Sequence, residues 1–402
     1  MPEDHSPYFT GHSRWASSVT IGLSGLLCRG FLYLLSSTET HGLDKFLRLL
    51  DERRDVDNRT RGLITVSNHT SVMDDPIMWG VLPIRYQWNP DNARWTMGSY
   101  DIVFQNRATS TFFSLGQALP THRNQHSPFG GLFQPTVTQA IRLLSRGPFN
   151  TPSPLPIHTK SPSPNADTSA ASILDIPDPF TNPTAPRPVT TYTTNFVDCF
   201  PAPSAYPSRR HTWVHVFPEG RIHQHPNRDM RYFKWGVSRM ILEADVCPDI
   251  VPIWIEGLDH IMHESRTTPR WLPRWGKEVS VTFGERVDVE QMFGGVREKW
   301  KRLVQEDSRQ RAMKMEDGSR SVDLDVGVLS EGLKYGREAV ELRKETTVMV
   351  RKLVLELRKQ RGLPDEDPKA SLADTWREEG KSDENVFGEP RQMKDGSWVK
   401  DD

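Results

Sequence analysis

Short runs of β-branched and aromatic residues, separated by helical stretches, constrain the fold of this chain more than any other feature. Four such runs are expected to be buried strands: residues 63–66, 213–217, 250–255 and 279–283. Between the second and third runs, residues 236–246 carry apolar side chains at helical spacing. Strands that alternate with helices are typical of α/β proteins. We therefore predict an α/β domain.

The 402 residues divide by composition into four segments. Residues 1–40 contain an apolar stretch, and residues 41–290 hold the predicted strands. Residues 291–362 are rich in Glu, Lys, Arg and Leu and are expected to form charged surface helices. Residues 363–402 hold 12 acidic and 6 basic side chains and are expected to be a disordered tail. Within the domain, 13 of the 60 residues in 151–210 are proline, which predicts a disordered insertion.

Charge and cysteine content exclude several classes of protein. The chain has 51 Lys and Arg against 52 Asp and Glu, a net charge of −1, which argues against a nucleic-acid binder. Cys28, Cys199 and Cys247 are scattered and form no C-x-x-C pair. Neither a disulfide framework nor a zinc site is therefore expected. Without its acidic tail the body is mildly basic, which suits an anionic surface or substrate.

Residues 19–35 form an apolar stretch that contains Arg29 and three glycines. Because a charge in the middle of a bilayer is costly, a full membrane span is disfavoured. We predict a helix that lies in the membrane interface, with Arg29 extended towards lipid phosphates. The residues before it include acids and no basic n-region, unlike a secretory signal. An ordinary buried helix packed on the domain is the alternative.

A histidine and an aspartate follow the first predicted strand with the spacing H-x-x-x-x-D. On one continuous helix, His69 and Asp74 would lie on different faces, so they can meet only if a turn or a helix start intervenes. Asp75, followed by proline, is expected to cap such a helix. A carboxylate bonded to one imidazole nitrogen fixes the tautomer and leaves the other nitrogen free as a base. His69 could then deprotonate a substrate hydroxyl; an ordinary loop histidine is the alternative.

Two further motifs suit an anionic group. Residues 217–221, Phe-Pro-Glu-Gly-Arg, follow a predicted strand, where α/β sheets bind ligands. Gly220 would allow a close backbone approach, Arg221 could hold a phosphate, and Glu219 could position an arginine or a substrate hydroxyl. Arg123 ends the motif G-x-x-x-P-x-x-R and adds a second cation. Solvated turns are the alternative for both.

The order of these motifs, followed by Val-Pro-Ile-Trp at 251–254, resembles the glycerolipid acyltransferases. The shared pattern is H-x-x-x-x-D, G-x-x-x-P-x-x-R and F-P-E-G, and it covers residues 15–290 apart from the insertion. Segments 68–76, 94–98 and 112–116 narrow the resemblance to members that pass acyl chains between phospholipids and lysophospholipids.

The resemblance implies a mixed sheet flanked by helices and a role for each matched residue. His69 would be the catalytic histidine and Asp74 its partner, while Arg123, Glu219 and Gly220 would bind glycerol and phosphate groups. The implied activity is CoA-independent acyl transfer that remodels cardiolipin from monolysocardiolipin, with no metal or other cofactor. The implied location is a mitochondrial membrane, inner or outer, with monotopic attachment facing the intermembrane space.

Two other functions stay open at this point. An acyl-CoA-dependent lysophospholipid or 1-acylglycerol-phosphate acyltransferase would use the same base and differ only in its acyl donor. A non-catalytic, membrane-docked lipid-binding protein, in which His69 and Asp74 merely cap a turn, belongs to another class.

Overall fold

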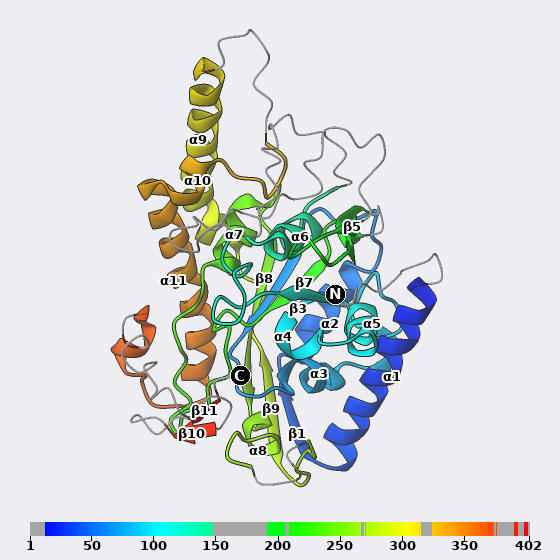
Figure 1. The fold of residues 1–402 in the computed structure, drawn as a ribbon. Coiled ribbons are helices and arrows are strands. Elements are labelled where there is room, and N and C mark those ends of the chain that lie inside the picture. The colour runs from blue at the N-terminus through cyan, green and yellow to red at the C-terminus, as the bar shows by residue number, and fades with distance from the viewer. Residues whose placement is uncertain are drawn as a thin grey trace, which may run out of the picture.

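A five-stranded mixed sheet forms the centre of the molecule (Figure 1). The computed structural model describes residues 13–147, 191–205, 209–266, 269, 271–314, 324–373, 375, 390–392 and 398–400. The strand order is β1-β9-β8-β2-β7, in which only β8 and β9 pair antiparallel. The strands are β1 (Ser37–His41), β2 (Leu63–Ser67), β7 (Trp213–Val216), β8 (Asp249–Glu256) and β9 (Glu278–Phe283).

Four of these strands lie within one residue of the positions that the apolar runs predicted, so the α/β prediction is confirmed. β2 is buried along its whole length, as expected of a central strand that is covered on both faces. β1 was not predicted because its sequence, Ser-Thr-Glu-Thr-His, is polar. It can be polar because it lies at the edge of the sheet and is only half-buried.

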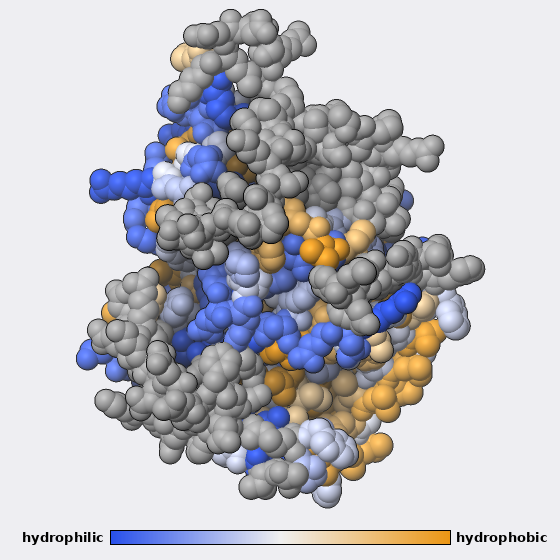
Figure 2. Space-filling view, in the orientation of Figure 1, coloured by the Kyte–Doolittle hydropathy of each residue, from blue (hydrophilic) through white to orange (hydrophobic). Residues whose placement is uncertain are grey.

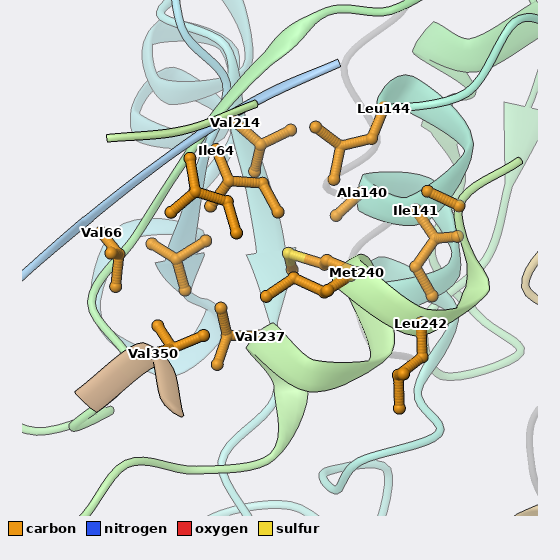
Figure 3. Close-up of a cluster of buried hydrophobic side chains, with 14 of the residues drawn as sticks. Ile64, Val66, Ala140, Ile141, Leu144, Val214, Val237, Met240, Leu242 and Val350 are labelled. Atoms are coloured by element: carbon orange, nitrogen blue, oxygen red, sulfur yellow. The ribbon is translucent and has the colours of Figure 1, made fainter. Parts of the chain in front are cut away.

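Helices cover both faces of the sheet and complete an α/β/α arrangement (Figure 1). Ile64 and Val66 contribute to one core while Leu63 contributes to the other, because successive strand side chains point to opposite faces. Figure 3 shows Ile141 and Met240 within the first of these cores. The helices are α1 (Ser13–Leu34), α2 (Leu43–Glu52), α3 (Asp74–Met78), α4 (Tyr100–Val103), α5 (Arg107–Leu115), α6 (Pro135–Leu143), α7 (Gly236–Glu243), α8 (Leu258–Ile261), α9 (Val289–Lys314), α10 (Glu331–Tyr335) and α11 (Arg337–Gln360), with the 3-10 helices η1 (Trp79–Val81), η2 (Ile84–Tyr86), η4 (Pro203–Ala205) and η6 (Pro368–Ser371).

A short pair of strands extends the sheet beyond β7. β3 (Thr96–Ser99) runs parallel to β4 (Ala118–Thr121). Just before β3, the Trp95 N–H donates to the Trp213 carbonyl oxygen at 2.8 Å, and the His215 N–H donates to the Trp95 carbonyl oxygen at 2.7 Å. These bonds attach the segment that ends in Arg123 to the strand that leads to Glu219.

The two charged stretches near the C-terminus form α9 and α11, but they are more than surface helices. Each is amphipathic, and its apolar face is buried: Phe293 and Trp300 of α9 and Val350 and Val354 of α11 belong to the first core. Figure 3 shows Val350 close to the side chains of the sheet and of α7. The sheet and these helices therefore share one hydrophobic core.

Part of the segment rich in Pro, Ser and Thr is folded, which corrects the prediction of disorder for that part. β5 (Thr191–Tyr192) pairs with β6 (Phe200–Pro201), and Tyr192 and Phe200 pack against Phe104 in a third, smaller core. The aromatic residues lie near the C-terminal end of the segment, so its average composition obscured them. The rest of the predicted insertion, 151–190 and 206–208, lies outside the described residues.

The start of the acidic tail also packs on the body, contrary to the prediction of disorder. Glu366 pairs with Arg351 of α11, and Ala370 is buried. Further on, β10 (Pro390–Gln392) pairs antiparallel with β11 (Trp398–Lys400). Most other tail residues lie outside the described ones.

α1 begins at Ser13, earlier than predicted, and packs on the body along one face only. Ile21 and Leu32 are buried, whereas an opposite row of apolar side chains is exposed: Trp15, Leu23, Leu26, Leu27 and Leu34. Figure 2 shows a band of hydrophobic residues along the lower right of the molecule, where α1 runs. Among the described residues, α1 is the one helix long and apolar enough to cross a membrane. The helix thus has features of both alternatives: one face packs on the domain, as in an ordinary buried helix, and the other face is free, as expected of a helix in a membrane interface.

The position of Arg29 differs from the prediction. Its guanidinium Nη1 lies 3.2, 3.2 and 3.3 Å from the carbonyl oxygens of Gly80, Val81 and Leu82, and its side chain lies over the Tyr33 ring. It therefore caps the carbonyl end of η1 and does not extend towards lipid phosphates. The last carbonyl groups of a helix have no hydrogen-bond partner within the helix, so their partial negative charge attracts a cation.

Candidate active site

The loop that carries His69 is fixed to the sheet immediately after β2. The Asn68 amide donates to the carbonyl oxygen of Ile255 at 2.9 Å, and its oxygen accepts the Ile255 N–H at 2.8 Å. Asn68 thus continues the pairing between β2 and β8 through its side chain after the β2 backbone turns away. This places His69 at the carboxyl end of a central strand, where α/β sheets commonly bind ligands.

A turn brings His69 and Asp74 together. The His69 Nδ1 lies 2.9 Å from Asp74 Oδ2. Asp74 is fully buried in the first turn of α3, and its Oδ2 also accepts the backbone N–H groups of Thr70 at 2.5 Å and Ser71 at 2.9 Å. A carboxylate held this firmly orients the imidazole and assigns the proton to Nδ1. The other nitrogen, Nε2, is then free to accept a proton.

The His69 backbone and ring are held from three further directions. Its ring stacks on Phe217, with 4.3 Å between ring centroids. Its N–H donates to Glu219 Oε1 at 2.7 Å, and its carbonyl oxygen accepts the His223 N–H at 2.9 Å. The imidazole side chain is 21% exposed. The histidine is therefore preorganised while one edge stays accessible to a substrate.

The Glu219 carboxylate bonds to two backbone N–H groups of the site, which are partners that the prediction did not include. Its two carboxylate oxygens accept the His69 N–H at 2.7 Å and the Arg231 N–H at 2.8 Å. The side chain is buried. Burial raises the pKa of Glu219 to about 7, although the two N–H donors favour its charged form. Glu219 thus joins the His69 loop to the segment after Gly220.

Four cationic side chains lie near one another in and beside the segment that follows Gly220: Arg123, Arg221, Arg231 and Lys234. Gly220 has a φ of +61°, and its carbonyl oxygen accepts a bond from Lys234 Nζ at 3.3 Å. Desolvation by the surrounding protein, and then the positive charges of Arg231, Arg221 and Arg123, lower the pKa of Lys234 to about 8. Arg123 and Arg221 were predicted. Arg231 and Lys234 were missed, although the basic and aromatic alternation of Arg-Tyr-Phe-Lys-Trp was a usable signal.

Arg123 is oriented by a carboxylate of α4. Its Nε donates to Asp101 Oδ1 at 3.1 Å, and its Nη2 donates to Oδ2 of the same residue. Such a two-point contact fixes the plane of the guanidinium group. The predicted anion-binding arginine is therefore held in place by a side chain that the sequence motif did not include.

Asp75 does not cap the helix, because α3 starts at Asp74 with Met73 as its N-cap. Its carboxylate instead accepts two bonds from Arg94, at 3.1 and 2.6 Å, and one from Trp79 Nε1 at 3.1 Å. Although burial opposes it, the charge of Arg94 and these bonds hold the pKa of Asp75 below its ordinary value. The pair joins the start of α3 to the segment before β3.

Two buried arginines of α11 hold the segment that carries Arg231. Arg358 donates to the carbonyl oxygens of Asn227 at 2.8 Å and Arg228 at 3.1 Å. Arg351 likewise donates to the Met230 carbonyl oxygen at 2.8 Å and to that of Arg231 at 3.1 Å. Since the N–H of Arg231 donates to Glu219, a continuous set of hydrogen bonds runs from α11 to the His69 loop.

The interior behind the loop offers little room. A cavity of about 10 Å³, lined in part by Asn68, Thr70 and Glu219, has space for about one water molecule. A substrate would therefore reach His69 from its exposed edge. Among the residues that the structure describes, no three His, Cys, Asp or Glu side chains are grouped so that they could hold a metal ion.

Comparison with known proteins agrees with this geometry. The Acyltransferase family profile matches residues 40–146, which include His69, Asp74 and Arg123. A tafazzin of Saccharomyces cerevisiae is 34% identical over 95% of this chain and 88% of its own length. A tafazzin of Dictyostelium discoideum is 27% identical over 67% of this chain and 69% of its own length. An N-acylphosphatidylethanolamine synthase of Arabidopsis thaliana is 25% identical over 64% of this chain and 65% of its own length.

These matches, together with the α/β fold and the paired histidine and aspartate, define the chain as an acyltransferase. The extent of the similarity to the yeast protein narrows this class. The chain belongs to the tafazzin family. Its substrates are accordingly lipids.

Proposed function

We propose that this protein transfers an acyl chain from a phospholipid directly to a lysophospholipid, without CoA, and that it remodels cardiolipin from monolysocardiolipin. One observation carries the proposal: an accessible histidine, paired at 2.9 Å with a buried aspartate, lies at the end of a central strand in a tafazzin-family chain. The free hydroxyl of the lysophospholipid makes a serine or cysteine nucleophile unnecessary.

In the proposed reaction His69 acts first as a base and then as an acid. Nε2 accepts the proton of the lysophospholipid hydroxyl, and the oxygen attacks the ester carbonyl of the donor lipid. The resulting tetrahedral intermediate breaks its bond to the donor's glycerol oxygen, which takes the proton back from Nε2. Asp74 stabilises the transient imidazolium ion. One ester forms as another breaks, so no energy source is needed, and general base catalysis of this kind contributes about 10²–10⁴-fold.

The second part of the proposal is that the four basic side chains near Gly220 bind the lipid headgroups. Arg123, Arg221, Arg231 and Lys234 would bind the phosphates of the two lipids, since cationic side chains form charge-assisted bonds with phosphate oxygens. A phosphate bound there would also favour the charged form of Lys234. Glu219 and Gly220 would then shape the backbone of this site and would not themselves contact phosphate.

The exposed face of α1 supports monotopic attachment. The helix is tied to the body near both ends: Ser17 donates to the Leu115 carbonyl oxygen at 2.5 Å, and Thr38 donates to that of Leu32 at 2.7 Å. A membrane-crossing orientation would break these contacts. We infer an in-plane position at a mitochondrial membrane, inner or outer, facing the intermembrane space. Because α1 also packs against α3, which carries Asp74, this position brings the site close to the lipid.

A reaction of purified protein with a labelled phosphatidylcholine donor and monolysocardiolipin, without CoA, tests the proposal. We expect labelled cardiolipin from the wild type, loss of at least about 100-fold in rate for His69→Ala, and unchanged activity for the surface control His260→Ala. Product that forms only when acyl-CoA is added would support the CoA-dependent alternative. Equal rates for wild type and His69→Ala would rule out the base. Labelled amide with an ethanolamine lipid would indicate an amine acceptor.

A further inference from the structure

The connection between α8 and β9 exposes two tryptophans that the proposed reaction does not use. Residues 271–277, which we call the tryptophan loop, have the sequence Trp-Leu-Pro-Arg-Trp-Gly-Lys. Trp271 is 77% exposed and Trp275 is 63% exposed, and Leu272 between them is exposed as well. Exposed apolar groups this large, gathered in seven residues, are typical of a surface that contacts something other than water.

Backbone hydrogen bonds fix the tryptophan loop to the end of α1. The Gly276 N–H donates to the carbonyl oxygen of Leu35 at 2.6 Å, and the Ser37 N–H donates to that of Lys277 at 2.9 Å. Leu34 and Leu35 are themselves exposed, so the apolar surface of α1 continues into the loop. Figure 1 shows the end of α1 and the chain around α8 at the same lower end of the molecule.

The charge of the tryptophan loop identifies the surface it fits. Arg274 is exposed, Lys277 is half-buried, and the loop contains no acidic residue. Indole rings favour the headgroup level of a bilayer, where the ring is desolvated while the N–H still reaches water. Basic side chains beside them are attracted to anionic lipids. Tryptophan and basic residues together, adjoining an apolar helix, therefore suit an anionic bilayer.

We propose that the tryptophan loop is a second membrane-docking element, in which Trp271 and Trp275 insert at the headgroup level of an anionic bilayer beside α1. This inference rests on the membrane attachment proposed above. An in-plane helix alone leaves the body free to roll about the helix axis. A second contact beside the helix end fixes that roll and, because α3 packs on α1, it fixes the height of the His69–Asp74 pair above the lipid.

Sedimentation with vesicles tests the proposal. The double variant Trp271→Ser/Trp275→Ser should bind vesicles of phosphatidylcholine with cardiolipin about tenfold less tightly or worse. Met313→Ser, which changes an 83% exposed apolar residue of α9, should bind like wild type. Arg274→Gln/Lys277→Gln should lose about fivefold per charge on cardiolipin vesicles and little on pure phosphatidylcholine. This second variant keeps the test decisive if the tryptophan variant fails to fold.

The outcomes separate this inference from the proposed function. If Leu26→Ser/Leu27→Ser loses binding while both loop variants bind like wild type, the tryptophan loop is not a docking element and α1 alone attaches the protein. If none of the variants loses binding, the proposed attachment itself is wrong. Activity on short-chain substrates in detergent should be equal in the loop variants and wild type. If the wild type shows no acyl transfer in that detergent assay, the proposed reaction is wrong, whatever the results of the vesicle-binding assay.

Discussion

Replacing Glu219 with glutamine should change how the stability of the protein depends on pH. Burial raises the pKa of Glu219 to about 7 from an ordinary 4.5, because its charged form has lost water and has only backbone N–H partners. In the unfolded chain the pKa returns to about 4.5. Between these values the folded protein holds a proton that the unfolded chain has released, so the proton stabilises the fold.

The size of the effect follows from the shift. At 1.36 kcal/mol per pKa unit, the raised pKa is worth about 3 kcal/mol. This contribution is complete below about pH 4.5 and is lost as the pH rises through about 7. Glutamine does not titrate. From pH 5 to pH 8, the free energy of unfolding of wild type should therefore fall by about 2–3 kcal/mol relative to that of Glu219→Gln.

Urea unfolding followed by tryptophan fluorescence, measured at several pH values in one mild detergent, provides the comparison. All other titrating groups are common to both proteins and cancel in the difference. Glu338→Gln, which alters an exposed carboxylate of α11, is the matched control. A difference in the free energy of unfolding between Glu219→Gln and wild type that does not vary with pH would show that the Glu219 carboxyl does not titrate near pH 7, and the reasoning from burial would be refuted.

Three other substitutions test separate parts of the structure. Asp74→Asn should reduce the acyl transfer rate about 10²–10⁴-fold with unchanged circular dichroism, because His69 loses its charged partner; a loss below about tenfold would contradict this. Arg94→Lys should lower the free energy of unfolding by about 1–3 kcal/mol, since lysine cannot make the two bonds to Asp75; an unchanged melting temperature would argue otherwise. Val350→Ala should cost about 2 kcal/mol through a core cavity while activity per folded molecule is kept; an equally large loss of activity would be unexpected.

The parts of the fold that could be predicted are those in which burial acts on consecutive residues. The apolar runs at 63–66 and 250–255 identified the central strands because both faces of those strands are covered. β1 is polar and lies at an edge, so its pairing with β9 left no comparable signal. The first turn of α1 likewise begins with polar residues, Ser13 and Arg14, and Arg14 pairs with Asp91, a contact distant in the sequence.

The site was predictable where its chemistry is local in the sequence. His69 and Asp74 lie five residues apart, and the turn between them was implied by the helix start that follows. The partners of Glu219 and Asp75 could not be inferred, because Glu219 bonds to backbone N–H groups and Asp75 to an arginine on another segment. Backbone donors of this kind carry no side-chain signature. They become visible only when the fold brings the segments together.

The hydrogen bonds from α11 to residues 227–231 imply that an active fragment of this protein must include α11. A chain shortened before Arg337 would keep the whole matched family profile at 40–146 and every residue named in the proposed reaction. It would nevertheless lose the two guanidinium groups that hold residues 227–231, the segment that Glu219 joins to the His69 loop. Truncation at the C-terminus should therefore abolish turnover without removing a single reacting group.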